Sequence, residues 1–505
     1  MNSGEPPAVN SERRLVAANG RIRAILAWLA AAGLGFVVVI VPLEQLALVS
    51  GAILVLASAL AHPVLAVCLV VLSVPVQELV TLPAGLTSTQ AATLLACFSW
   101  LLHTLAHPER AMLPGGILPL WGTFLCALLL SAGLTPYARA EAIRETLRWS
   151  VAAIIWLIAA GTATRRWHMI CLLACLLLAP AVCAAIGVVQ FATGDGPPAF
   201  RIAPNLPYVR AYGTIGQPNS FAGYMNMAWP LGLALAMVAT RFAWRRPAAP
   251  TLHPLLHIGG RWLLTGLLWA ATALLLAALL ASFSRGAWLG ALAGALGLAL
   301  ALERRVWRAL LMMAVVAMIM LLLAAAGLLP GALAARLASM AHSLTFFDAA
   351  TAHVTPENFA VVERMAQMQA GWAMFLAAPL TGIGPGNYAV AYPEFAVGAW
   401  YSGRGHAHNY YLHLAAETGI IGLLAYLGLI GGLIRQTMIA LRCTTDPFLR
   451  SVVAGSCGII TAVAGHNLFE NLHVLNMGMQ LATIWAVLHI IARSAANPRG
   501  PSCGI

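Results

Sequence analysis

Long runs of apolar residues, separated by short polar stretches, repeat along almost the whole chain. An α-helix that crosses the hydrocarbon core of a bilayer needs about 20 consecutive apolar residues. Fourteen segments meet this requirement; the second is short and a polar break at 284–285 separates two others, so 12 to 14 spans are predicted. The segments are 24–42, 45–61, 63–82, 88–106, 116–134, 149–164, 168–191, 218–240, 262–282, 286–302, 309–329, 410–434, 451–467 and 474–492. We therefore expect an all-α fold, a polytopic transmembrane helix bundle.

Two predicted outer loops are longer than the other connections, 192–217 and 330–409. Within the second, Asn358 to Ala378 carries apolar residues at helical spacing and is stopped by Pro379. The apolar positions are Val361, Val362, Met365, Met368, Trp372, Phe375 and Leu376. The spacing predicts one large extracytoplasmic loop with an amphipathic helix that lies against the outer face of the bundle.

The composition agrees with a membrane protein. Of 505 residues, 61% are hydrophobic and 9% are charged, which excludes an ordinary soluble protein and a disordered chain. All 28 basic residues are arginines, so P-loop ATPases and enzymes that depend on a lysine are excluded. The formal net charge of +12 is compatible with either nucleic-acid binding or basic cytoplasmic loops.

The positions of the arginines decide between these two explanations. With a cytoplasmic amino terminus, 19 of the 28 arginines fall in cytoplasmic segments, as the positive-inside rule requires. We expect both termini in the cytoplasm, a first span that is an anchor and not a cleaved signal, contact with membrane lipids and no nucleic-acid partner. The nine outer arginines are Arg139, Arg144, Arg148, Arg201, Arg210, Arg285, Arg336, Arg364 and Arg404.

Two outer arginines stand in unusual surroundings. Arg210 precedes a turn with two glycines and Pro218 that leads to Asn219, which is either a functional turn or a polar turn whose arginine meets lipid phosphate. Arg285 follows Ser284 in a very short connection between two apolar spans. An arginine near hydrocarbon is costly, so an anionic ligand is favoured over simple snorkelling at a helix end.

Three further polar groups belong to the outer side. The glycine-rich stretch 382–388 could cradle a phosphate but is more often a tight loop. His406 and His408 precede Asn409 at the start of a span; no third ligand at a known metal-site spacing accompanies them, so proton removal is favoured over metal binding. His466 and Glu470 are one helical turn apart and either face one cavity or cap the span. The nine cysteines include no CxxC, so neither a disulfide framework nor a thiolate zinc site is expected.

A combination of these motifs resembles a known family. His408-Asn409, nine residues and Gly419-Ile-Ile-Gly422 are similar to the signature of the bacterial O-antigen ligase and polymerase superfamily. Arg210, Ser284-Arg285-Gly286 and the stretch from Pro379 to Gly384 fit the same pattern. The resemblance covers about 205–475. It divides the chain into N-terminal helices (1–204), a ligase-like region (205–492, with the loop 330–409) and a cytoplasmic tail (493–505).

The resemblance implies an inverting, metal-independent glycosyltransferase without a cofactor, in the bacterial inner membrane with its active site facing the periplasm. The donor would be a glycan on undecaprenyl diphosphate, and the acceptor a sugar hydroxyl of lipid A-core or of another glycan. His408 would be the general base or would orient the acceptor. Arg210, Arg285 and Arg404 would bind the diphosphate, with support from Tyr212, Asn219, Ser284, Asn409, Gly419 and Gly422.

Several activities remain open within and beyond the superfamily. A ligase is slightly favoured over a Wzy-type polymerase. The large loop is, however, longer than we expect for a ligase that acts on lipopolysaccharide core. An O-oligosaccharyltransferase is less favoured, since only about a dozen residues follow the last predicted span. A secondary transporter is also less favoured, because the spans are nearly free of acidic residues and the polar groups collect on one side.

Overall fold

The structure, a computed structural model, describes residues 43–80, 85–108, 114–202, 206–244, 254–303, 346–355 and 358–496, with scattered positions between 308 and 331. The predicted first span, 24–42, lies outside the described residues, and so does most of 309–329. The chain forms two compact units, Met1–Ala61 and His62–Ile505. Helix α2 (Leu43–Ala61) is the described part of the first unit.

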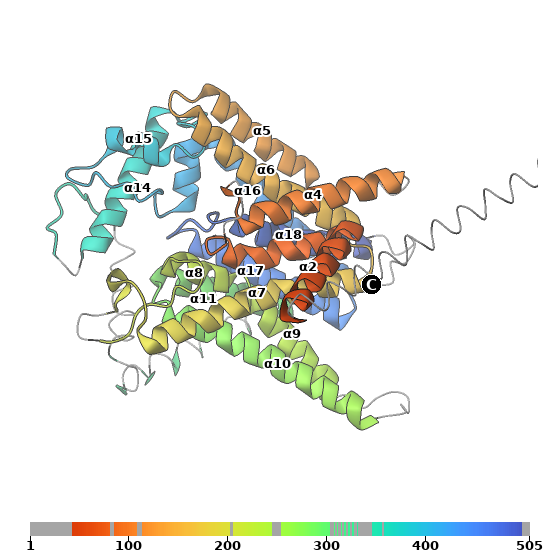
Figure 1. The fold of residues 1–505 in the computed structure, drawn as a ribbon. Helices are drawn as coiled ribbons and strands as arrows, with labels where there is room; N and C mark the ends of the chain where they lie inside the picture. The colour runs from red at the N-terminus through yellow and green to blue at the C-terminus, as the bar shows by residue number, and fades with distance from the viewer. Residues whose placement is uncertain are drawn as a thin grey trace, which may run out of the picture. The chain divides into compact units, whose positions relative to one another are not determined.

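The regular elements of the second unit are helices, together with two isolated β-bridges, so the predicted all-α fold is confirmed for the described residues. The helices are α3 (Pro63–Ser73), η1 (Val74–Val76), α4 (Ser88–Ala106), α5 (Leu118–Leu134), α6 (Arg139–Thr162), α7 (Arg166–Thr193), η4 (Pro198–Phe200), α8 (Pro218–Asn226), α9 (Trp229–Trp244), α10 (Pro254–Ala281), α11 (Arg285–Leu302), α14 (Phe359–Ala377), α15 (Tyr388–Phe395), α16 (Tyr410–Cys443), α17 (Pro447–His466) and α18 (Met477–Ala496) (Figure 1).

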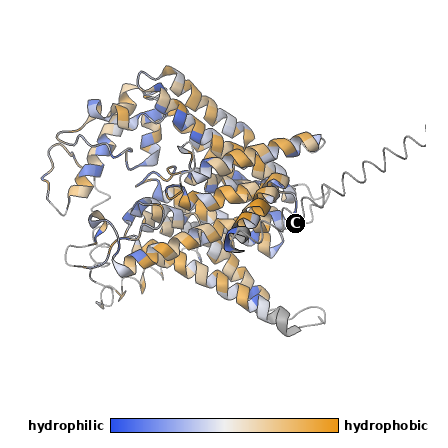
Figure 2. Ribbon diagram, in the orientation of Figure 1, coloured by the Kyte–Doolittle hydropathy of each residue, from blue (hydrophilic) through white to orange (hydrophobic). Residues whose placement is uncertain are grey.

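Six helical segments of the described chain are long and apolar enough to cross a membrane, and three more are apolar but shorter. Most helices are hydrophobic along their length (Figure 2). Large apolar side chains such as Leu178, Leu263 and Leu267 are exposed, which lipid tolerates and water does not. The chain is therefore a multi-pass membrane protein. The total of 12 to 14 spans stays a prediction.

Some helix boundaries differ from the sequence-based expectation for local reasons. Helix α6 begins at Arg139, well before the predicted start at 149, because the ion pairs Arg144–Glu141 and Arg148–Glu145 support its first turns. The predicted span 218–240 is interrupted between α8 and α9. Pro230 stands at the start of α9, and its missing N–H group cannot continue the α8 hydrogen-bond ladder.

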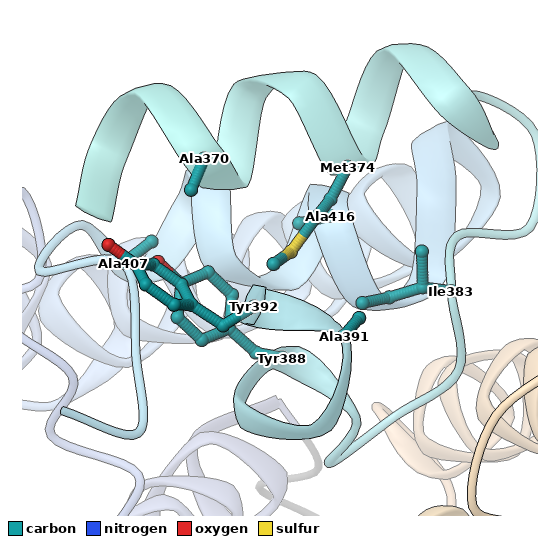
Figure 3. Close-up of a cluster of buried hydrophobic side chains, with 8 residues drawn as sticks. All are labelled: Ala370, Met374, Ile383, Tyr388, Ala391, Tyr392, Ala407 and Ala416. Carbon is teal, nitrogen blue, oxygen red and sulfur yellow. The ribbon is translucent and has the colours of Figure 1, made fainter. Parts of the chain in front are cut away.

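The predicted amphipathic helix exists as α14 and packs on α15 and α16. Figure 1 places α14 and α15 together at one end of the bundle. Ala370 and Met374 of α14 lie in a buried cluster with Tyr388, Tyr392 and residues before and within α16 (Figure 3). The buried face differs from the predicted stripe, since Trp372 remains exposed while small residues permit the close contact.

Close packing of α11 against α17 fixes the positions of two functional segments. Gly290 and Gly294 of α11 face α17 so closely that an added Cβ would lie 2.8 Å from the Ala462 carbonyl oxygen and 2.7 Å from the Ala462 Cβ. Small residues allow helix backbones to approach in this way within a membrane. The packing places the start of α11 beside the end of α17.

Candidate active site

The ends of several helices surround a pocket of about 230 Å³. Helix α11 begins there with Arg285, α16 begins directly after Asn409, and α17 ends nearby before Leu468. Helix α14 closes one side. The pocket is lined by Arg285, Phe346, Val361, Arg364, Met365, Met368, His408, Asn409, Leu468 and Phe469.

His408 is held at this pocket by the loop that leads into α16. Its backbone has a φ of 50°, a left-handed conformation that is uncommon for a residue other than glycine and often marks a functional position. Its Nδ1 lies 3.3 Å from Oε1 of Glu470. Because Nδ1 faces the carboxylate, the Nε2 nitrogen is left for a ligand in the pocket.

Glu470 is buried and joins several polar groups from distant segments. Its Oε1 lies 2.9 Å from Nε2 of His406, and its Oε2 accepts a 2.7 Å hydrogen bond from Nδ2 of Asn219. Arg210 donates from Nη2 to Oδ1 of Asn219 at 2.8 Å, and from Nε to the Ser282 carbonyl oxygen at 2.8 Å. A continuous chain of contacts therefore connects Arg210 with the two histidines through Asn219 and Glu470.

The electrostatics of this chain favour a neutral histidine beside a charged carboxylate. Burial lowers the pKa of His408 from its ordinary value of 6.5, and this effect outweighs the neighbouring Glu470. Burial alone would raise the pKa of Glu470, but His408 and His406 hold it well below its usual range. A neutral His408 whose Nδ1 faces Glu470 presents its Nε2 to the pocket.

The predicted arginines have different surroundings. Arg285 is the first residue of α11 and lines the pocket, and Ser284 is the buried N-cap residue of that helix. Arg210 is connected to His408 through the contacts above and is not among the residues that line the pocket. Arg404 is largely exposed and bonds Glu363 at 3.0 Å, so the structure does not bring it to the pocket.

Arg364 is the arginine that sequence reasoning did not select. It lies on α14, lines the pocket and is near enough to His408 to lower that residue's pKa. Arg364 lies three positions after Val361 and four positions before Met368. Residues at these spacings share one face of a helix, so Arg364 is on the apolar face of the predicted amphipathic helix. A basic residue on that face was the signal available in the sequence.

Of the signature residues after His408, Asn409 lines the pocket, whereas Gly419 and Gly422 shape helix α16. Asn409 is the N-cap of α16 and accepts from the Leu412 N–H group at 3.1 Å. Gly419 has a φ of 64° and interrupts α16, and its missing Cβ leaves room for the Leu380 backbone. Gly422 lies against the side chain of Thr418 in the preceding turn.

The glycine-rich stretch 382–388 packs at this interruption. Its Gly384 N–H group donates to the Glu417 carbonyl oxygen at 2.8 Å. The Glu417 carboxylate accepts from the N–H groups of Gly386, at 2.8 Å, and Tyr388, at 3.0 Å. These donors are already occupied, so the stretch is a tight loop and not the phosphate cradle considered from the sequence.

Two other residues differ from the expected arrangement. Tyr212 packs its ring on Phe200, points its hydroxyl toward the Asp195 carbonyl oxygen at 3.5 Å and is not among the residues that line the pocket. His466 ends α17, so Glu470 lies in the following turn and not one helical turn further along the same helix. The turn, rather than helical spacing, directs Glu470 to the histidines.

The cluster of His406, His408 and Glu470 has the composition of a metal site. One ligand atom from each residue lies within 4.8 Å of the others. Glu470 is the third group that the sequence did not assign to the His-x-His pair, because 62 positions separate it from His408. The eight described cysteines are free.

Part of the chain is similar to a known protein family. No curated protein matches the chain. Residues 270–427 match the family described as O-antigen ligase, and this segment includes Arg285, Arg364, His408 and the interruption of α16. The matched segment, 270–427, is therefore similar to the O-antigen ligase family and lies within a multi-pass membrane protein.

Proposed function

We propose that the protein is a membrane glycosyltransferase that moves a glycan from undecaprenyl diphosphate to a sugar hydroxyl, as an O-antigen ligase. The observation that carries this proposal is one pocket lined by Arg285, Arg364 and His408. The Nδ1 nitrogen of His408 faces Glu470. Arginines are suited to bind a diphosphate, and a histidine is suited to remove the proton of an acceptor hydroxyl.

The reaction is a single displacement at the anomeric carbon. The acceptor oxygen forms a bond to that carbon while the bond to the diphosphate oxygen breaks, and the configuration inverts. The acceptor proton passes to Nε2 of His408, and the electron pair leaves with undecaprenyl diphosphate. Glu470 stabilises the resulting imidazolium, and Arg285 and Arg364 stabilise the charge on the leaving group. Arg210 acts indirectly, because it positions Asn219 and thereby Glu470.

We infer that the reaction needs no metal ion, because two arginines in the pocket supply the positive charge that a diphosphate leaving group requires. His406, His408 and Glu470 then serve as a hydrogen-bonded acid–base group. Purified protein should transfer glycan equally well with EDTA and with added zinc. Loss of transfer in EDTA and its return with zinc would instead assign the three residues to a metal.

We place the pocket on the periplasmic side of the inner membrane. Helix α10 ends at the pocket, and its Arg261 lies near the opposite end; helix α16 starts at the pocket, and Arg435 and Arg442 lie near its far end. Arginines enriched at the end opposite the pocket indicate the cytoplasm.

The deciding experiment compares surface polysaccharide from cells that carry His408→Ala with that from wild-type cells. A lost ligase leaves long glycans on the lipid carrier and a bare lipopolysaccharide core. A lost polymerase, the second candidate, leaves core with a single repeat unit; the long loop, 330–409, is the observation that keeps this candidate. Arg144→Gln, an exposed outer arginine, is the matched control. Unchanged glycans in His408→Ala cells would refute the glycosyltransferase proposal.

A further inference from the structure

A second cavity, of about 330 Å³, lies at the other end of the helices. Helices α7, α9 and α10 and the start of α17 form it. About 30 Å of helix separates Arg261, at the cavity, from Ala281, which adjoins the candidate active site. This length equals the hydrocarbon thickness of a bilayer, so the two sites are one bilayer core apart along α10.

The lining of this cavity is apolar except for two arginines at one end. Arg166 is the first residue of α7, and Arg261 lies in the first part of α10. The guanidinium of Arg166 lies 5.7 Å from the ring centre of Phe448, which orients it at the cavity. The apolar residues are Ile170, Leu173, Ala174, Leu177, Leu235, Val238, Ala239, Phe242, Leu264, Leu268 and Phe448.

The dimensions match one leaflet of a bilayer. From Arg166 to Leu177, the lining of α7 extends about 16 Å along the helix, and half of a hydrocarbon core is about 15 Å. A ligand with an anionic head at the arginines and a hydrocarbon chain along the helices satisfies both parts of the cavity. Basic pockets between transmembrane helices bind phospholipid head groups for this reason.

We propose that this groove is a binding site for an anionic phospholipid, with the phosphate between Arg166 and Arg261 and an acyl chain against α7 and α9. A second copy of the chain is a poorer occupant, because it has few acidic groups to meet these arginines. Among the described residues at this end of the second unit, Glu303 pairs with Arg308, and Asp446 caps α17.

The test measures lipid binding to the purified full-length protein by native mass spectrometry. Dioleoylphosphatidylglycerol should bind in preference to dioleoylphosphatidylcholine, on the order of tenfold for two arginines. The double variant Arg166→Gln with Arg261→Gln should lose this preference, whereas Arg435→Gln, an exposed arginine at the same end, should keep it.

A second variant tests the acyl-chain part. Ala239→Trp should fill the groove and remove the bound lipid, and Leu424→Trp on the exposed face of α16 should not. Equal binding of both lipids, or full lipid occupancy in Ala239→Trp, would overturn the proposal. A dimer in the wild type that Ala239→Trp dissociates would assign the groove to a second copy, and equal stabilisation by inorganic phosphate alone would exclude the lipid chain.

Discussion

At the scale of residues, Glu470 is the centre of the candidate active site. It is a buried carboxylate, and such a group is stable only when charged or polar partners surround it. His406 and His408, from the loop before α16, and Asn219, from α8, provide those partners. The same contacts orient His408, so one side chain serves both the stability of the site and its proposed chemistry.

Glu470→Gln should reduce glycan transfer on the order of 10²-fold or more, because the imidazolium of His408 loses its counter-charge. Glu470 also raises the pKa of His408, so the variant should shift the acid limb of activity to lower pH. Glu470→Asp should recover part of the activity. A Gln variant with reduced protein level but an unchanged pH profile would show a structural role only.

The pH dependence of the wild type follows from the lowered pKa of His408. The base must be neutral, so activity is present above this pKa and is lost as pH falls through it. Because burial lowers the pKa of His408 from 6.5, more activity should remain at pH 6.5 than an ordinary histidine, half protonated at that pH, would leave. An acid limb centred above 6.5 would contradict this assignment. The measurement is kcat/KM for transfer against pH.

Arg364→Gln should reduce the catalytic efficiency toward the diphosphate donor by at least tenfold, since it removes a charge from the pocket. Arg404→Gln should have a much smaller effect, because Arg404 pairs with Glu363 outside the pocket. Kinetics with a fixed acceptor and varied donor compare the two variants. A larger loss of efficiency in Arg404→Gln than in Arg364→Gln would instead identify Arg404 as the diphosphate ligand.

At the scale of elements, the interruption of α16 is the feature that joins the large loop to the bundle. The Ile420 N–H group donates to the Pro379 carbonyl oxygen at 2.8 Å, and the Glu417 carboxylate holds the start of α15. The helix must therefore break at Gly419, where the loop backbone crosses. In this way, the glycines of the signature determine where α14 and its Arg364 lie.

Gly419→Ala should destabilise the protein by about 1–3 kcal/mol or more, because alanine resists a φ of 64° and its Cβ would overlap the Leu380 backbone. Gly428→Ala in the same helix is the control, since no atom lies within 4 Å of its added Cβ. Thermal unfolding in detergent should separate the two variants. An equal melting temperature for both would refute this account of the signature.

At the scale of the whole molecule, the polar residues of the pocket and a second group of arginines lie at opposite ends of the helices of the second unit. The cluster of His406, His408 and Glu470 and the arginines of the pocket lie at one end of α10, α16 and α17. Arginines such as Arg261, Arg435 and Arg450 lie near the other end. Between them, the helices are apolar (Figure 2). This arrangement suits a substrate that is charged at the membrane surface and hydrophobic within it.

The proposed orientation predicts a difference in accessibility. A membrane-impermeant maleimide applied to intact spheroplasts should label Ser402→Cys, in the exposed loop before His408, and should leave Cys443 unlabelled. Cys443 should react only after the membrane is permeabilised. Mass spectrometry identifies the labelled residue, and labelling of Cys443 in intact spheroplasts would invert the topology.

The sequence by itself determined the helical class, the positions of several long apolar helices and the histidine at the start of α16. Hydrophobic length and helical spacing are local properties, so residues such as Arg285 and His408 could be selected without coordinates. Their pairing was decided only by tertiary structure. Glu470 reaches His408 through a turn after α17, and Arg364 reaches the pocket because Gly419 allows the loop to return to α16. Such contacts depend on the packing of distant segments, which no local pattern encodes.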